Sequence, residues 1–394
     1  MYSFIETEGQ NGYTPQLTIN SNRYVTNGAF DPQLLKDDIN SLREEGIPVI
    51  ASIGGQNGHV ELNTVAEKNE FVQGLKDIVD EYGFDGIDLD FEGGSMNFGA
   101  GALTDFSYTG ISAFPKLKNV VDAFKEIKQH YGSNFILTCA PETFYVQVGQ
   151  STYSNTAGAF LPVIHNLRDE LDLVMVQLYN TGSVNALDGQ AYSQATPDFL
   201  TSMSDILITG FDVASTGFHF DGLPDSKIMV GIPSCPDAAP AGGYLQPSET
   251  LKALDYMRFG TTFTGRNYTL QNGAHPNLRG VMTWSVNWDA AAACASEYEF
   301  SSSYFNYFNS TASVDEGIKD DLFQIYPNPF ENSLTIHSPL EITGIQLFDL
   351  NGKKLYHKLK LDNSVLNLSV LESGLYILEL KTKSNIVYKK LLKK

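Results

Sequence analysis

Residues 85–92 read Asp-Gly-Ile-Asp-Leu-Asp-Phe-Glu, an octet in which acidic and large apolar residues alternate. Successive side chains of a β-strand point to opposite faces, so the pattern predicts a strand with one apolar and one acidic face. The apolar face carries Ile87, Leu89 and Phe91, and the acidic face carries Asp88, Asp90 and Glu92. Carboxylates this close cannot all ionise freely, so we expect at least one to keep its proton near neutral pH, as a general acid must.

The octet alone leaves three interpretations open. The acidic face could be the solvated side of an ordinary strand, although the segment also reads as a buried strand that follows an amphipathic helix. It could be a metal site, since hard cations take carboxylate oxygens, but the loop pattern of a calcium site and a nearby His are missing. The third interpretation is the acid cluster of a glycosidase.

The spacing Asp85-x-x-Asp88-x-Asp90-x-Glu92 resembles the catalytic signature of family 18 glycoside hydrolases, the chitinases and their relatives. The segment Ser52-Ile53-Gly54-Gly55 resembles the second signature of the family. A glycine pair after a strand also occurs in phosphate-binding loops, but the Lys and the Ser or Thr that such a loop requires do not follow here. The resemblance covers residues 2 to about 300 and implies a (β/α)8 TIM barrel.

The order of strand and helix patterns agrees with such a barrel. Short apolar strands separated by helices are predicted at residues 2–7, 48–53, 86–92, 135–141, 173–179, 228–232 and 280–286. These are seven strands, whereas a full barrel has eight. We therefore expect that the first barrel strand and its helix are absent from this chain, and that the parent gene extends upstream and carries the signal peptide.

The resemblance also implies site residues at the carboxyl ends of the strands. Glu92 is expected to protonate the glycosidic oxygen, while Asp90 orients the substrate's own acetamido group for attack on the anomeric carbon. Asp88 is expected to accept a hydrogen bond from Ser52 and to share a proton with Asp90. The other expected site residues are Tyr179, which would bind the acetamido carbonyl, and Glu142, Gln177, Asn180 and Trp284, which would bind substrate.

Without the resemblance, Gln177, Tyr179 and Trp284 could equally be ordinary core side chains. With it, Trp284 is expected to form the floor under the sugar at the cleavage point, and the loop with Tyr145 and Gln147 is expected to shape the cleft. The family's supporting Tyr on the first strand has no counterpart here, so the resemblance bears more directly on the parent enzyme than on this chain.

The resemblance predicts a retaining chitinase that hydrolyses β-1,4-linked N-acetylglucosamine without metal or cofactor. Only about 47 residues separate the last two strands, too few for the insertion that deepens the cleft in one subgroup, so we expect cleavage inside polymer chains. Two alternatives stay open. One is an endo-β-N-acetylglucosaminidase acting on N-glycans, and the other is a chitin-binding lectin, a class that commonly lacks the Glu retained here as Glu92.

Composition and charge narrow the range of partners. The 394 residues are 42% hydrophobic and 18% charged, and no apolar run is long enough to span a membrane. The net charge of -20 disfavours nucleic acid. Residues 1–314 hold 15 basic and 36 acidic side chains, whereas residues 315–394 hold 11 and 10, which indicates two domains. Three cysteines allow at most one disulfide.

We expect a catalytic barrel at residues 1–300, a linker at 301–322 and a small all-β sandwich at 323–394. Asn351-Gly352 predicts a tight hairpin within the sandwich. Its segments Ile325 to Pro329, Leu347 to Lys353 and Ser373 to Tyr376, with a Lys-rich end, resemble the C-terminal sorting domain of type IX secretion. This implies a secreted or cell-surface protein. A carbohydrate-binding module is the alternative, but the segment has no Trp.

Overall fold

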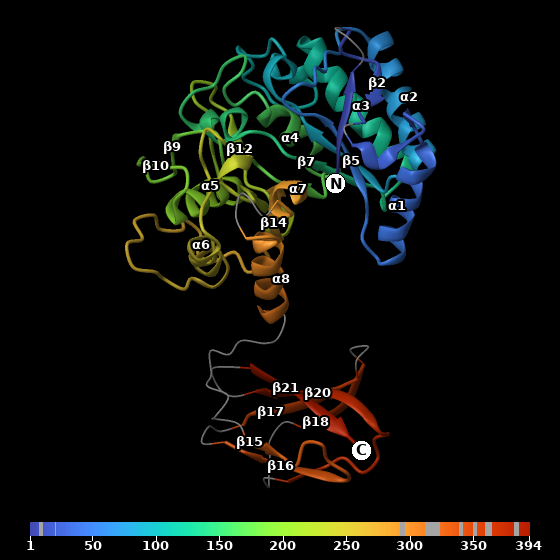
Figure 1. The fold of residues 1–394 in the computed structure, drawn as a ribbon. Coiled ribbons are helices and arrows are strands. Elements are labelled where there is room, and N and C mark those ends of the chain that lie inside the picture. Colours follow the sequence, from blue (N-terminus) through green and yellow to red (C-terminus); the bar gives the residue numbers. More distant parts are fainter. Residues whose placement is uncertain are drawn as a thin grey trace. The chain divides into compact units, whose positions relative to one another are not determined.

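The computed structural model describes residues 1–7, 11–19, 21–291, 296–311, 324–338, 342–349, 353–358, 365–381 and 386–394. The chain divides into two compact units, Met1–Tyr304 and Phe305–Lys394. Figure 1 shows the first unit as a mixture of helices and strands and the second as strands alone beyond the helix at its start.

Seven parallel strands form the wall of the first unit. Five of them pair in the order β1 (Tyr2–Thr7), β5 (Ile50–Gly54), β6 (Gly86–Asp90), β7 (Ile136–Cys139) and β8 (Leu173–Val174). The last two, β13 (Met229–Pro233) and β14 (Gly280–Trp284), pair with each other. Parallel bridges from Val174 to Ile228 and from Gln177 to Gly231 join β8 to β13, so all seven strands form one continuous wall.

The two ends of this wall approach each other through aromatic side chains. The ring of Trp284 at the end of β14 stacks on the ring of Phe4 in β1, with centroids 5.6 Å apart. Among the described residues, no strand ladder joins β14 to β1. The barrel predicted from the sequence is therefore present in its seven recognised strands, and the expected absence of a first strand and helix stays a prediction.

Helices follow the strands and cover the outside of the wall, with α1, α2 and α3 side by side (Figure 1). The helices are α1 (Pro32–Glu44), α2 (Val65–Tyr82), α3 (Pro115–Tyr131), α4 (Leu161–Leu167), α5 (Pro197–Thr209), α6 (Pro247–Phe259), α7 (Val286–Asp289) and α8 (Glu299–Thr311). Sequence sets their ends: α2 begins with a capping box between Thr64 and Glu67 and ends at Gly83, which is left-handed with φ 73°.

The centre of the octet, Gly86–Asp90, forms β6 as predicted, and Phe91 and Glu92 follow directly after it. Ile87, Leu89 and Phe91 are fully buried on the helix side of the wall. The Phe91 ring contacts Phe124 of α3 and Phe160, with centroids 6.0 and 6.4 Å away. Because the helices take up the apolar face, alternation directs the three carboxylates to the inside of the barrel.

Short strands and hairpins extend the loops of the first unit. They are β2 (Pro15–Leu17), β3 (Val25–Thr26), β4 (Ala29–Phe30), β9 (Ser183–Asn185), β10 (Ala191–Ser193), β11 (Gly210–Asp212) and β12 (His219–Asp221). Cys235 is disulfide-bonded, whereas Cys139 is a buried free thiol. Within the described part of the chain, no helix has the length and apolar character needed to cross a membrane.

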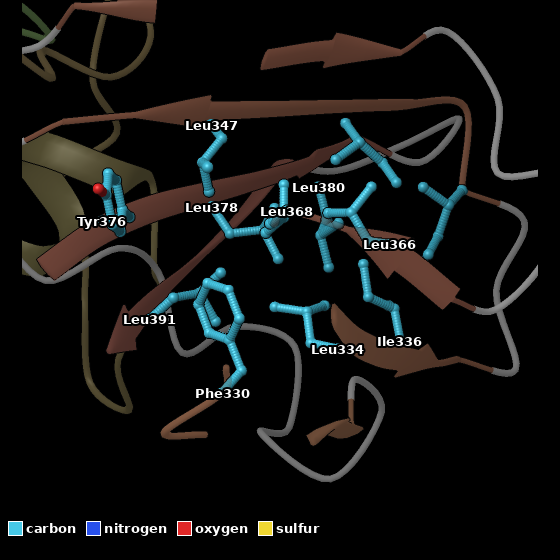
Figure 2. Packing of buried hydrophobic residues seen from close by; sticks show 12 residues of the cluster. Phe330, Leu334, Ile336, Leu347, Leu366, Leu368, Tyr376, Leu378, Leu380 and Leu391 are labelled. Atoms are coloured by element: carbon cyan, nitrogen blue, oxygen red, sulfur yellow. The ribbon is translucent and has the colours of Figure 1, made fainter. Parts of the chain in front are cut away.

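The second unit consists of two antiparallel sheets around one core. One sheet has the order β15 (Gln324–Tyr326), β16 (Ser333–His337), β19 (Val365–Asn367), and the other β18 (Lys354–Lys358), β17 (Gly344–Phe348), β20 (Gly374–Lys381), β21 (Ile386–Lys393). Leu334 and Leu366 of the first sheet pack in the same cluster as Leu347 and Leu378 of the second (Figure 2). The predicted β-sandwich is therefore observed, while its Asn351-Gly352 turn lies outside the described residues.

The expected linker at 301–322 is wrong at its start, because residues 301–311 belong to α8. This segment is rich in Ser, but its aromatic residues Phe300, Tyr304 and Tyr307 are spaced as on one face of a helix. The rings of Phe300 and Tyr304 contact each other, with centroids 4.5 Å apart. Aromatic side chains one turn apart stabilise a helix even where the residues between them are polar.

Candidate active site

Asp88 lies fully buried at the centre of a row of hydrogen bonds across three strands. Ser52 of β5 and Thr138 of β7 are its register partners on either side. The Ser52 hydroxyl donates to Oδ2 of Asp88 at 2.8 Å, and the Thr138 hydroxyl donates to Oδ1 at 2.5 Å. Burial raises the pKa of Asp88 to about 6, although the two hydroxyl donors favour the ionised form.

Asp90 and Glu92 share a single amide donor above Asp88. Nε2 of Gln177 donates to Oδ1 of Asp90 at 2.9 Å and to Oε1 of Glu92 at 3.1 Å. Burial, followed by the charge of Glu92, raises the pKa of Asp90 well above its ordinary value. Burial also raises the pKa of Glu92, against the opposing hydrogen bonds from Gln177 and Asp90. Each carboxyl group of the pair therefore retains a proton more readily than an isolated acid, as expected for like charges in close contact.

A further acid and two tyrosines surround this pair. Burial, followed by the charge of Glu92, raises the pKa of Glu142. The hydroxyl of Tyr145 is hydrogen-bonded to Glu142 and accepts the backbone N–H of Gly93 at 3.0 Å. Burial, followed by the charge of Asp90, raises the pKa of Tyr179, so its hydroxyl stays protonated and can donate a hydrogen bond.

These groups open into a cavity of about 550 Å³ at the carboxyl ends of the strands. Its lining includes Asp90, Glu92, Glu142, Gln177, Tyr179, Asn180 and Trp284, together with Phe4, Gln56 and Trp288. A deeper cavity of about 300 Å³ reaches Ser52 and Asp88 and shares Asp90 and Trp284 with the first. The acid row and the aromatic floor thus line adjoining cavities, of which the outer one is of a size that accommodates a sugar.

Two close backbone approaches hold this arrangement and require glycine. The backbone N–H of Gly55 donates to the carbonyl of Asp90 at 2.7 Å, and a Cβ on Gly54 would lie 2.2 Å from that carbonyl oxygen. A Cβ on Gly243 would lie 2.4 Å from Cβ of Tyr179. Both Gly54 and Gly243 have a φ of 117°, which side chains rarely permit. The glycine pair thus lies directly against the backbone that carries the acid row.

The structure brings together all nine residues expected at the site. Three contributors were missed: Thr138, which holds Asp88, Phe4, which stacks on Trp284, and Trp288, which is partly exposed in the cavity. The signal for Thr138 was its polar character inside an apolar strand beside the acid row. Gln147 was expected to shape the cleft, but it is fully buried and its Nε2 donates to the carbonyl of Met203.

Asp85, the first acid of the octet, has a structural position. Its Oδ2 accepts the backbone N–H of Val49 at 2.8 Å, and its Oδ1 pairs with Nε of Arg43 at 3.0 Å. Asp85 thus ties the start of β6 to β5 and to α1, at the end of the strand remote from the cavity. The signature therefore combines one structural acid with three site acids.

A parallel barrel whose acid row and aromatic floor lie at the carboxyl ends of its strands is typical of glycosidases. Residues 1–319 match the family model of glycosyl hydrolases family 18, and residues 324–394 match that of the secretion system C-terminal sorting domain. The chain belongs to glycosyl hydrolases family 18 and carries a C-terminal sorting domain of the type IX kind, so both resemblances are confirmed.

Similar proteins include the chitinase ChiA of Flavobacterium johnsoniae, 53% identical over 92% of this chain, and the chitinase Chi52 of Paenibacillus xylanexedens, 44% identical over 70%. The matched segments make up 23% and 51% of those two proteins. The crystal structure of a family 18 chitinase from Chromobacterium violaceum is 34% identical and has a TM-score of 0.64, covering 77% of this chain and 74% of that one.

The shared Gln177 donor generates a test of the site's electrostatics. Replacing Gln177 by Leu removes a hydrogen bond that stabilises ionised Glu92, so the pKa of Glu92 should rise further. NMR titration of labelled glutamate carboxyl groups measures it. Gln150→Leu is the matched control, since Nε2 of Gln150 donates to the carbonyl of Ala186 instead. An unchanged or lowered Glu92 pKa in Gln177→Leu would contradict the assignment.

Proposed function

We propose that the chain is the catalytic part of a chitinase, which hydrolyses β-1,4 links between N-acetylglucosamine units. The observation that carries this proposal is the pair Asp90 and Glu92, joined by Gln177 beside Trp284 in one cavity. Two relatives that cover most of this chain are named chitinases, which favours chitin over N-glycans as substrate. The retained and positioned Glu92 argues against a lectin without activity.

Glu92 is proposed as the general acid. Burial raises its pKa, so its carboxyl stays protonated at a higher pH than that of an ordinary glutamate. Turnover should therefore be lost as the pH rises through this raised pKa. Glu92 follows the end of β6 and lines the cavity, where its proton can reach the oxygen of the leaving sugar.

The nucleophile is proposed to be the substrate's own acetamido oxygen, which attacks the anomeric carbon from the opposite face. Asp90 would accept the acetamido N–H and offset the positive charge that develops on this group. The Tyr179 hydroxyl, kept protonated by burial, would donate to the acetamido group. Ser52 and Thr138 fix Asp88 below, and burial raises its pKa to about 6, so Asp88 takes up a proton more readily than an ordinary aspartate.

Cleavage inside polymer chains is proposed from the shape of the rim. Residues 234–279, between β13 and β14, contain the helix α6 and a short turn of 3-10 helix but no strand. No additional sheet therefore rises from this segment to wall the cleft. An open cleft lets a polymer bind across the site without threading an end.

Glu92→Gln should lower turnover on N-acetylglucosamine oligomers by roughly 10²- to 10⁴-fold while leaving their binding largely intact, because the amide keeps its shape but cannot donate the proton. Steady-state kinetics and calorimetry measure both quantities. Asp85→Asn is the control from the same octet and should retain turnover per folded molecule. Near-normal turnover in Glu92→Gln would remove Glu92 from its role.

We also propose that residues 324–394 direct export of the parent protein through type IX secretion, to the medium or the cell surface. The match of this segment to a sorting domain and its separate hydrophobic core support the proposal. A domain with its own core can fold independently of the passenger that it accompanies.

Deleting residues 324–394 should abolish export from a cell with type IX secretion and spare chitin hydrolysis, because the acid row lies wholly in the first unit. Activity in cell and medium fractions measures both. As a positive arm, fusing 324–394 to an unrelated exported passenger should send it to the medium. Normal export of the deletion variant together with lost affinity for chitin would favour a binding module instead.

A further inference from the structure

A second cavity, larger than either at the acid row, lies on one flank of the barrel. Its volume is about 690 Å³, and it lies among the β9–β10 hairpin, the start of α5, α6 and the segment after α6. Figure 1 shows β9, β10, α5 and α6 gathered on the same side of this unit. A cavity of this size is in the range of small-molecule sites.

The lining combines aromatic rings with hydrogen-bond acceptors. Tyr192 and Phe263 contribute the rings, and Asp188 and Glu249 contribute carboxylates. The hydroxyl of Tyr192 donates to Asp188 at 2.6 Å, which fixes this ring and carboxylate relative to each other. Asn267 completes the set and is held by hydrogen bonds from its backbone N–H and its side-chain amide to Asp198.

The charge of this cavity selects against anions and metals. None of the lining residues is Lys or Arg, although Lys252 pairs with Glu249 from outside the lining. Across the described ranges, no three His, Cys, Asp or Glu side chains are arranged to hold a metal ion. Arg266 lies between the lining residues Gly265 and Asn267, and its guanidinium donates to the Tyr256 hydroxyl and the Tyr268 carbonyl. The rings, carboxylates and amides of the lining suit a ligand that presents hydroxyl groups and a positive charge.

Gln194 connects this cavity to the rim of the catalytic cleft. Its Oε1 accepts the backbone N–H of Thr181 at 2.9 Å, and its Nε2 donates to the carbonyl of Ala241 at 2.8 Å. Ala241 lines the cleft and donates its backbone N–H to Oδ1 of Asn180 at 3.0 Å. The neighbours of Gln194 on the other side, Ser193 and Thr196, line the second cavity. Gln194 therefore lies between the rim of the catalytic cleft and the second cavity.

We propose that this cavity is a non-catalytic binding site for amino-sugar units of a chitin-type polymer, with preference for units that carry a free ammonium group. The proposal rests on the proposed function for the identity of the polymer. The ring of Phe263 contacts the sugar beside the largely buried ring of Tyr192, and Asp188 and Glu249 accept its hydroxyl and ammonium hydrogens. The site would retain partly deacetylated chains beside the cleft.

The test is calorimetric titration of the full chain carrying Glu92→Gln with two probes, the N-acetylglucosamine hexamer and the fully deacetylated glucosamine hexamer. We expect two sites per chain, of which one prefers the deacetylated hexamer and weakens with added salt. Adding Phe263→Ala should lower the affinity of that site roughly tenfold. Adding Asp188→Asn should remove its preference for the deacetylated hexamer.

Phe259→Ala is the matched control, since Phe259 ends α6 with an exposed ring outside the cavity. It should leave both sites unchanged. A single site that Phe263→Ala does not affect would overturn the second site while the proposed function stands. Tighter binding of the acetylated hexamer at the second site would overturn the role of its carboxylates. Absence of binding to both hexamers would contradict the proposed function itself.

Discussion

Three carboxyl groups on one strand, turned into the interior of a barrel, are the constraint on which this structure depends. An ionised carboxylate taken from water costs several kcal/mol unless it is paired or hydrogen-bonded. Among the residues that the structure describes, no Lys or Arg side chain lines the cleft that holds Asp90 and Glu92, so other groups must meet this cost. Hydroxyl groups from the two neighbouring strands hold Asp88, and one amide holds Asp90 and Glu92 together. Burial raises all three pKa values, so protonation can relieve the part of the desolvation cost that these hydrogen bonds do not offset.

The groups that stabilise the buried acids also affect the pKa values on which proton donation depends. A cation in the cleft would stabilise the ionised acids and lower their pKa values, leaving no proton to donate near neutrality. The neutral donors orient the carboxyl groups and lower the pKa values of Asp88 and Glu92 less than burial raises them. The charged amino group of Met1 also favours ionised Asp88, and burial outweighs that effect too. The position of Asp90 also explains why residue 54 is a glycine. A side chain at residue 54 would displace the backbone that carries Asp90. Residues far from the octet in sequence, such as Gly54 and Gln177, are thus constrained by the need to position its acids.

Local alternation was sufficient to predict the faces of the octet, and the resemblance to a family located Gln177, Tyr179 and Trp284 around it. Contacts that depend on pairing between strands were harder to predict. Thr138 binds Asp88 because β7 pairs with β6 in a particular register, and Phe4 meets Trp284 because the two ends of the wall converge. The linker was wrongly extended over α8, since Ser-rich composition outweighed the helical spacing of Phe300 and Tyr304. For α8, the helical spacing of the aromatic residues was a better guide to structure than the Ser-rich composition.

The central claim is that the acid row works through the substrate's own acetamido group, with Glu92 as acid and Asp90 as the orienting group. In such a neighbouring-group reaction the acetamido oxygen displaces the leaving sugar from the anomeric carbon, and water then displaces the acetamido oxygen. Two inversions at the same carbon retain its configuration. Proton NMR of the first products released from an N-acetylglucosamine oligomer, recorded before mutarotation, tests this directly. The account predicts β anomers at the new reducing ends, and α anomers would contradict it.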